Sequence, residues 1–199
     1  MSFPTIVIAS GNTGKVREIR AALQPLAARL PCLADLGLNG AEEPYGTFFE
    51  NALAKARAAA AVSGETAVAD DSGLVVKALN GAPGVHSARY GGDKTDDATN
   101  NNKLLQEMVG KKDRTAFYYA AMVLVQTAND PAPMFAEGFW CGEIINESRG
   151  DGGFGYDPLF YDPRVGKTGA QMTLEEKEAV SHRGQSLREL MRLIKTRRF

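Results

Sequence analysis

The chain has 199 residues, and its 23 basic residues nearly balance its 24 acidic ones. This balance leaves no strong field that would attract nucleic acid, and no apolar run approaches the ~20 residues that are needed to cross a membrane. Two cysteines, Cys32 and Cys141, are too few and too far apart for a disulfide framework or a zinc site. We therefore expect one domain over residues 1–199 in a reducing cytoplasm, with no nucleic-acid or membrane partner.

The chain opens with an apolar strand, expected over Thr5–Ala9, and a helix, expected from Lys15 to about Leu30. Between them lies the turn Ser10-Gly11-Asn12-Thr13-Gly14-Lys15. The N–H groups that start a helix attract anions, glycine lets the backbone approach a ligand, and the lysine adds a positive charge. Although the spacing is not that of a Walker A loop, we interpret the turn as a triphosphate site. The alternative is an ordinary strand-to-helix turn.

A short second strand is expected over Cys32–Leu36, followed by a loop that carries the adjacent carboxylates Glu42 and Glu43. Thr47–Val62 has strong helical periodicity. On one face of this helix, Thr47, Asn51 and Lys55 recur at four-residue spacing. Such a face can aim polar groups at one target, or it can simply face solvent.

A third strand is expected over Thr66–Ala69, and a fourth over Leu74–Leu79. Asp70, Asp71 and Ser72 lie between them. Because successive strand side chains point to opposite faces, the two aspartates cannot both face one site unless the strand has ended. We expect one of them to face a catalytic cleft and the other to make local hydrogen bonds.

The second half of the chain predicts a helix, a long hairpin, a glycine-rich loop and two helices. Their expected ranges are Asp97–Met108, Thr115–Gln126 with Met134–Ile145, Gly150–Pro158, a short helix capped at Thr173, and a last helix that follows an interruption at Ser181–Gly184. Basic residues at the end of the last helix suit the helix dipole without any nucleic acid.

The acidic pairs and the glycine turn together indicate nucleotide hydrolysis. Carboxylates repel a phosphate unless a metal ion bridges them, and Mg²⁺ does so with one or two carboxylates, waters and phosphate oxygens. A remaining carboxylate can deprotonate a water. Phe154 can stack on a base or plug the core, and His182 with Arg183 can bind a base edge or simply begin a helix.

The motifs in combination resemble a known family. They are Ser10–Lys15 with Arg17-Glu18, Glu42-Glu43, Phe49–Ala52, Ala69–Leu74, Gly81–Gly84, Ser87–Tyr90, Gly152–Pro158 and Ser181–Gly184, in order along nearly the whole chain. The chain is similar to the Ham1/RdgB-type inosine/xanthosine triphosphate pyrophosphatases. The resemblance implies a curved mixed β-sheet with helices, two lobes around a central substrate cleft, a homodimer and Mg²⁺. It also implies cleavage of ITP, dITP or XTP to the monophosphate and pyrophosphate. Ser10 stands where threonine is common, and it keeps the hydroxyl.

The resemblance also implies roles for individual residues. Ser10 to Lys15 would hold the phosphates, and Lys55 would lie near the phosphate chain. Asp71 would be the general base and a Mg²⁺ ligand, with Glu42 or Glu43 as the second acidic ligand. Ser72 would touch the substrate. The base pocket would consist of Phe154, Gly155, Tyr156, Asp157, Lys177, His182 and Arg183.

Hydrogen bonding to the base suggests a hypothesis for how such a site would select these purines over adenine. Hypoxanthine and xanthine carry an acceptor at O6, where adenine carries a donor amino group. Donors from His182 and Arg183 would meet adenine donor to donor, which costs ~1–3 kcal/mol for each unpaired buried donor. The alternatives are a pyrophosphatase for another modified nucleotide and a nucleotide-binding sensor without turnover.

Overall fold

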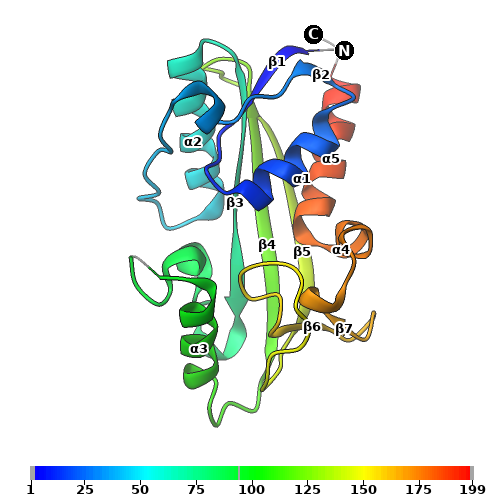
Figure 1. The fold of residues 1–199 in the computed structure, drawn as a ribbon. Coiled ribbons are helices and arrows are strands. Elements are labelled where there is room, and N and C mark those ends of the chain that lie inside the picture. The colour runs from blue at the N-terminus through cyan, green and yellow to red at the C-terminus, as the bar shows by residue number, and fades with distance from the viewer. Residues whose placement is uncertain (1–2, 94, 198–199) are drawn as a thin grey trace. The chain divides into compact units, whose positions relative to one another are not determined.

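The structure, a computed structural model, describes residues 3–93 and 95–197 (Figure 1). The strands are β1 (Phe3–Ile8), β2 (Ala27–Arg29), β3 (Thr66–Val76), β4 (Thr115–Val125), β5 (Met134–Ile144), β6 (Phe160–Asp162) and β7 (Lys167–Thr168). The α-helices are α1 (Thr13–Leu23), α2 (Phe48–Ser63), α3 (Asp97–Glu107), α4 (Leu174–Val180) and α5 (His182–Thr196). In this part of the chain no helix is both long and apolar enough to span a bilayer.

Within these residues the strands form one seven-stranded sheet in the order β2-β1-β3-β4-β5-β6-β7. β1 pairs in parallel with β2 and with β3, whereas β6 pairs antiparallel with β5 and with β7. The predicted α/β class with a mixed sheet is therefore confirmed.

Two compact units divide the described residues. The first unit contains the residues up to Asp71, Ala120–Glu137 and the residues from Ser186 onward. The second unit contains Ser72–Tyr119 and Gly138–Gln185. The expected single domain with two lobes around a central cleft stays a prediction.

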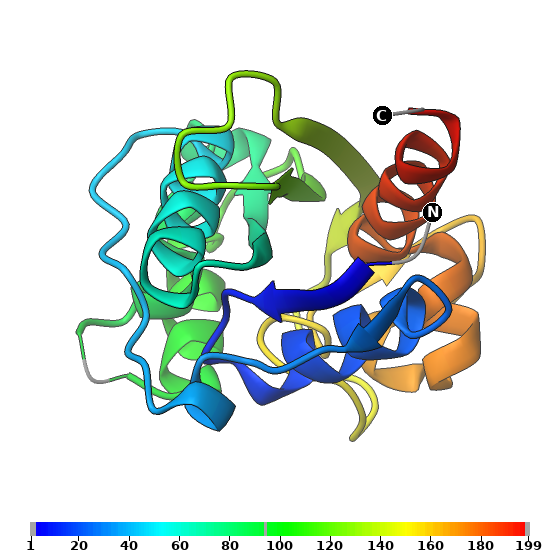
Figure 2. The same cartoon turned by 90° about the horizontal axis from the view of Figure 1, so that it is seen from above.

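The core of the first unit follows from the alternation of side chains along β1. Ile8 packs in a cluster with Ile19 of α1 and Leu190 of α5. Its neighbour Val7 points to the other side, where it lines a groove with Val62 of α2. α1 and α2 accordingly lie on opposite sides of β1 (Figure 2).

The second unit has a core that is rich in aromatic residues. Trp140 and Phe160 are fully buried and pack edge to face, with 4.8 Å between ring centroids. Tyr118 packs against both rings, and Leu104 attaches α3 to the same cluster. The Trp140 indole N–H donates to Asp162 Oδ2 at 2.8 Å, so its polar atom is satisfied inside the core.

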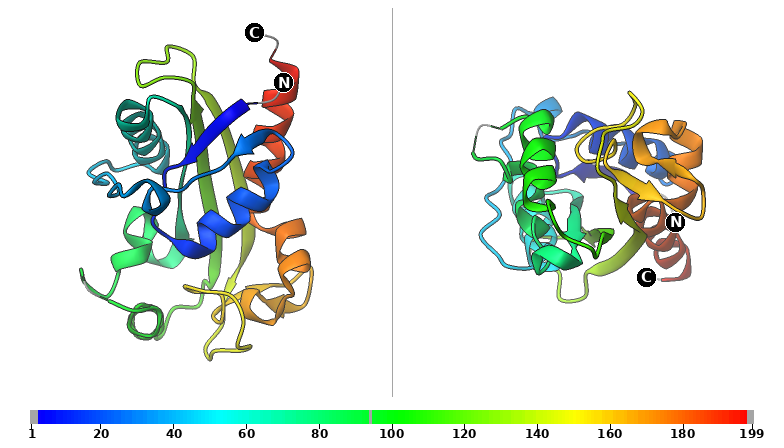
Figure 3. Two further views of the ribbon diagram at one scale, coloured as in Figure 1. Left: turned by 45° about the horizontal axis from the view of Figure 1, so that its top comes forward. Right: turned by 90° about the horizontal axis from the view of Figure 1, so that it is seen from below.

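The segment after the first helix differs from the expectation. α1 ends at Leu23, well before Leu30, and β2 follows it beside β1 (Figure 3). Pro25 explains the stop, because it has no N–H to continue the helical hydrogen bonds. The sequence reasoning missed β2 because this short strand followed a helical pattern without a glycine between them.

The strand expected over Cys32–Leu36 is wrong for most of its length. Cys32 alone forms a parallel bridge, with Ile8. Ala34–Leu36 is a short 3-10 helix, and Gly37 ends it at a φ of 66°. Asp35 stabilises the turn by accepting a hydrogen bond from the Cys32 N–H at 2.9 Å.

Two interruptions expected from polar residues are also wrong. β3 runs without a break through Asp70 and Asp71 and ends at Val76, because lysines neutralise both carboxylates in the strand. Ser181 alone separates α4 from α5, so His182 and Arg183 already belong to the last helix. The two short strands β6 and β7 were not expected.

Candidate active site

The glycine turn between β1 and α1 is held by its own side chains. Asn12 caps α1, and its Oδ1 accepts a hydrogen bond from the Lys15 N–H at 3.0 Å. Ser10 Oγ accepts one from the Asn12 N–H at 3.2 Å. Gly11 lies outside the left-handed region, and a Cβ added there would meet nothing within 4 Å. The turn itself therefore does not require glycine at this position, whereas a ligand that approaches the backbone would.

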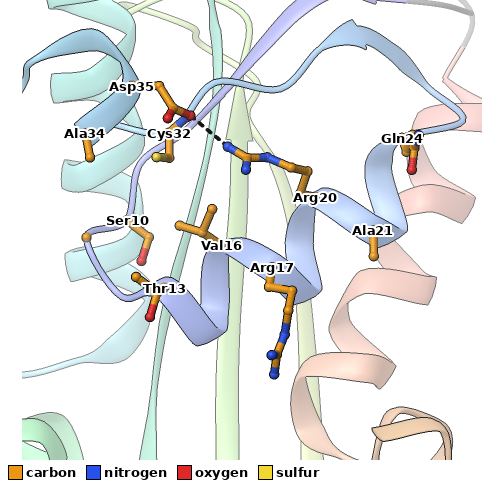
Figure 4. A pocket seen from close by; sticks show the side chains of 11 residues that line it. Ser10, Thr13, Val16, Arg17, Arg20, Ala21, Gln24, Cys32, Ala34 and Asp35 are labelled. Carbon is orange, nitrogen blue, oxygen red and sulfur yellow. Dashed lines mark hydrogen bonds and ion pairs between the residues drawn. The ribbon is translucent and has the colours of Figure 1, made fainter.

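One side of this turn opens into a pocket of about 560 Å³, which is within the usual range for small-molecule sites. Figure 4 shows Ser10 and Thr13 at this pocket, together with Arg17 and Arg20 of α1. Arg20 is engaged, because its Nη2 lies 2.7 Å from Asp35 Oδ2. The turn thus presents hydroxyl groups and an arginine-bearing helix face to the same space.

Asp70 and Asp71 have different surroundings, as the alternation of strand side chains requires. Asp70 Oδ2 lies 2.9 Å from Lys15 Nζ, so the lysine of the glycine turn is tied to β3. Asp71 Oδ1 lies 2.9 Å from Lys55 Nζ of α2. Each carboxylate therefore has its own lysine.

α2 directs two polar side chains at Asp71. Lys55 Nζ contacts both Asp71 Oδ1 and, at 2.7 Å, Glu43 Oε1. Asn51 Nδ2 donates to Asp71 Oδ2 at 3.3 Å. Asn51 and Lys55 are both buried, so the solvent-facing alternative is wrong for them. Thr47 does not share this role, because it is the N-cap of α2.

The environment shifts the pKa values of this group in a consistent way. Burial raises the pKa of the Asp71 carboxyl, the charges of Lys55 and Lys15 oppose this rise, and the charge of Glu43 adds to it. Burial alone would lower the pKa of Lys55, but the charges of Asp71 and Glu43 outweigh it and raise the pKa. Lys55 therefore stays charged, while Asp71 is a stronger base than an exposed aspartate.

Glu42 and Glu43, which the sequence left as alternatives, differ in the structure. Glu43 shares the Lys55 ammonium with Asp71, whereas the side chain of Glu42 is exposed. Glu43 and Asp71 offer oxygen donors only, which suits a hard ion such as Mg²⁺. No group of three or more metal-ligating side chains gathers anywhere in the described ranges. A Mg²⁺ ion held by two carboxylates, waters and substrate oxygens does not need one.

The second unit holds the glycine-rich loop Gly150–Pro158, which we call the base loop. Its Phe154 ring lies beside two cations. Lys177 Nζ is 4.6 Å from the ring centroid, and Arg183 Cζ is 5.8 Å from it. Both distances are within the range of cation–π attraction. Lys177 and Arg183, which were predicted for the base pocket together with Phe154, therefore both lie beside the Phe154 ring.

Asp157 organises the base loop from inside. It is buried, it accepts a hydrogen bond from the Phe154 N–H at 2.9 Å, and it forms an ion pair with Lys177. A Cβ on Gly153 would lie 2.1 Å from Asp157 Oδ2, and Gly153 has a φ of 75°. Glycine is therefore required at position 153 by the close approach of this carboxylate and by the backbone.

His182 and Arg183 begin α5 but face different surroundings. The His182 ring stacks on Tyr118, with 4.7 Å between centroids and 7° between planes. Arg183 Nη2 donates to Ser72 Oγ at 2.9 Å. The same guanidinium lies beside the Phe154 ring. Arg183 and Ser72 therefore join the base loop, whereas the His182 ring packs among the aromatic residues of the core.

Two residues at the base loop were missed by the sequence reasoning. Asp97 and Asn101 of α3 hydrogen-bond the peptide groups of Gly155. An aspartate at a helix start usually indicates only a cap, so this contact could not be predicted from the sequence. Tyr156, which was predicted at the base pocket, is 3% exposed, and its hydroxyl donates to the Ser87 carbonyl at 2.8 Å.

Comparison with known proteins agrees with this architecture. The family model described as "Ham1 family" matches residues 6–193. A protein of Nitrosomonas europaea named dITP/XTP pyrophosphatase is 50% identical over 189 residues, which are 95% of this chain and 93% of the relative. A protein of Ralstonia nicotianae with the same name is 53% identical over 190 residues, or 94% of each chain.

Solved structures agree as well. The structure of a HAM1 protein from Coxiella burnetii has a TM-score of 0.91 and 42% identity, and the match covers 99% of this chain and all of that one. The Ham1 protein of Staphylococcus aureus has a TM-score of 0.87 and 38% identity, over 96% of this chain and 98% of that one. This chain therefore belongs to the Ham1 family.

Proposed function

We propose that the chain hydrolyses non-standard purine nucleoside triphosphates (ITP, dITP and XTP) to the monophosphate and pyrophosphate. The proposal is supported by relatives of about 50% identity that are named dITP/XTP pyrophosphatase. The observation that carries it is Asp71, a buried carboxylate of raised pKa that Lys55 and Asn51 hold in place.

Asp71 has the properties of a general base. Its raised pKa makes it a better proton acceptor, and two contacts from α2 fix its orientation. In the proposed step, a water oxygen bonds to the α-phosphorus and its proton goes to Asp71. The bond between the α-phosphorus and the bridging oxygen breaks, and pyrophosphate leaves.

Charge arithmetic around Asp71 argues for a metal ion. We call Lys15, Glu43, Lys55, Asp70 and Asp71 the lysine–carboxylate cluster; its three carboxylates exceed its two ammonium groups by one charge when all are ionised. Such a group would repel a triphosphate by itself. Glu43 and Asp71 would hold Mg²⁺, which when bound supplies the missing positive charge and polarises a phosphoryl oxygen. Lys15 and Lys55 would then contact the phosphates.

The base loop would bind a purine base. The Phe154 ring would stack on the purine, and the Arg183 guanidinium would donate to O6 of hypoxanthine or xanthine. Arg183 is 2% exposed, so adenine would leave one of its donors without a partner. This would select against ATP.

The test is pyrophosphate release from ITP, dITP, XTP, GTP and ATP with and without Mg²⁺. We expect Mg²⁺-dependent turnover of the first three, and a loss of at least ~100-fold in kcat for Asp71→Asn. Asp93→Asn, at an exposed aspartate outside the cluster, is the matched control. Tight ITP binding without product in the wild type would instead identify a nucleotide sensor. The homodimer and the cytoplasmic location stay predictions.

A further inference from the structure

Phe154 lies between two glycines, so the local backbone does little to restrict its conformation. It is flanked by Gly153 at a φ of 75° and Gly155 at a φ of 61°. Glycine loses more conformational freedom on folding than any other residue, so a Gly-Phe-Gly segment needs outside contacts to keep one conformation. Asp157 provides one such contact, to the Phe154 N–H.

The contacts on the other side of Phe154 come from α3. The Gly155 N–H donates to Asp97 Oδ2 at 2.6 Å, and the Gly155 carbonyl accepts from Asn101 Nδ2 at 2.9 Å. The four-residue spacing places Asp97 and Asn101 on one face of the helix. They therefore hold the two peptide groups of one glycine, as a clamp. The base loop lies beside α3 in the second unit (Figures 1 and 3).

The N-cap of α3, its contacts with the preceding segment and its core packing come from three other residues. Asp96 is its N-cap and accepts a hydrogen bond from the Thr99 N–H at 2.8 Å. Asn100, which is buried, bonds the Gly91 N–H and the Ala88 carbonyl. Leu104 joins the core of the second unit. The helix is thus capped and packed by other residues.

We propose that Asp97 and Asn101 are positioning residues that set the place of the Phe154 ring for the purine base. The inference rests on the proposed function of the base loop. A stacked base interacts with Phe154 both in the bound substrate and in the transition state. Loss of the clamp therefore weakens binding uniformly and raises KM while kcat stays constant.

The kinetic test compares Asp97→Ala, Asn101→Ala and the double variant with Asn102→Ala. Asn102 is exposed on the same helix and is the matched control. We expect each clamp variant to raise KM for ITP about 3- to 10-fold with kcat within about twofold, as the loss of one hydrogen bond predicts. Asp97→Asn keeps an acceptor oxygen and should recover most of the affinity. The ITP-to-ATP ratio of kcat/KM should not change, because Arg183 remains.

A second readout does not depend on turnover. Amide hydrogen exchange at Gly155 should become faster in Asp97→Ala, while the exchange at Leu104 in the core stays as in the wild type. Unchanged KM in the double variant, or unchanged exchange at Gly155, would overturn the clamp. If the wild type released no pyrophosphate, the proposed function would fail. The clamp would then still be tested by two measurements on each variant, the amide exchange at Gly155 and the dissociation constant for ITP.

Discussion

A single ammonium group, that of Lys55, forms ion pairs with two carboxylates in the first unit, Glu43 and Asp71. The side chains of Lys55 and Asp71 are 10% and 7% exposed, so water screens little of this pair. Lys55→Met would leave Asp71 and Glu43 adjacent without their cation. We expect the free energy of unfolding in EDTA to fall by about 3 kcal/mol, as for a broken buried ion pair. Urea denaturation measures it.

Lys77 provides the comparison for Lys55. It also pairs with a carboxylate, Asp113, but the two side chains are 73% and 41% exposed. Lys77→Met should change the free energy of unfolding by no more than ~0.5 kcal/mol, because exposed ion pairs contribute little. Equal losses in the two variants would contradict the view that burial makes Lys55 important.

Arg183 is the residue at which base selectivity can be tested. Its guanidinium lies near Phe154 and bonds Ser72. Arg183→Ala removes the donor that would distinguish O6 from an amino group, so the ITP-to-ATP ratio of kcat/KM should fall by about 10-fold. Arg192, which pairs with Glu189 on the exposed side of the same helix, is the control. A ratio that stays at the wild-type value in Arg183→Ala would contradict the role.

Residue pairing was partly predictable from the sequence. The period of two in a strand separated Asp70 from Asp71, and the helical spacing put Asn51 and Lys55 on one face. The choice between Glu42 and Glu43 was not predictable, because both lie in an irregular loop without periodicity. The place of the His182 ring was not predictable either, because it packs on Tyr118, a residue distant in the chain.

At the scale of elements, the turn that leads into β4 depends on an ionised aspartate. The Thr115 N–H donates to Asp113 Oδ1 at 3.0 Å. Hydrogen bonds from Thr115, with a further contribution from Lys77, lower the pKa of Asp113 to about 2. A carboxyl with a lowered pKa stabilises the fold above its ordinary pKa of 3.8, and this contribution is lost as the pH falls toward 2.

Asp113→Asn should therefore be less stable than the wild type at pH 6, and the difference should shrink between pH 4 and pH 2. Urea midpoints at several pH values measure it, and the NMR titration of Asp113 should have its midpoint at about 2. A difference that grows on acidification would have the wrong sign for a lowered pKa.

Elements with strong periodicity were predictable, and those defined by distant pairing were not. α2, α3, β4 and β5 appear close to their expected ranges because an apolar stripe or alternation sets each of them. β2, β6 and β7 are only two or three residues long and exist because a neighbouring strand pairs with them. The expected break in β3 failed because buried lysines neutralise its aspartates.

The three long strands β3, β4 and β5 link the two units covalently. β3 changes unit after Asp71, β4 after Tyr119 and β5 after Glu137. Each unit therefore contains only part of every long strand. Because a strand cannot lose the pairing of one part without disturbing the rest, we expect the two units to unfold together.

Trp140, the single tryptophan, allows this cooperativity to be tested. It is fully buried in the second unit, so its fluorescence reports on that unit, whereas far-UV circular dichroism reports on both. Leu190→Ala would open a cavity in the core of the first unit and should lower the free energy of unfolding by about 2–4 kcal/mol. The urea midpoints from both signals should coincide in the wild type and shift equally in the variant. A dichroism midpoint that moved while the Trp140 midpoint stayed in place would mean that the units unfold independently, despite the strands they share.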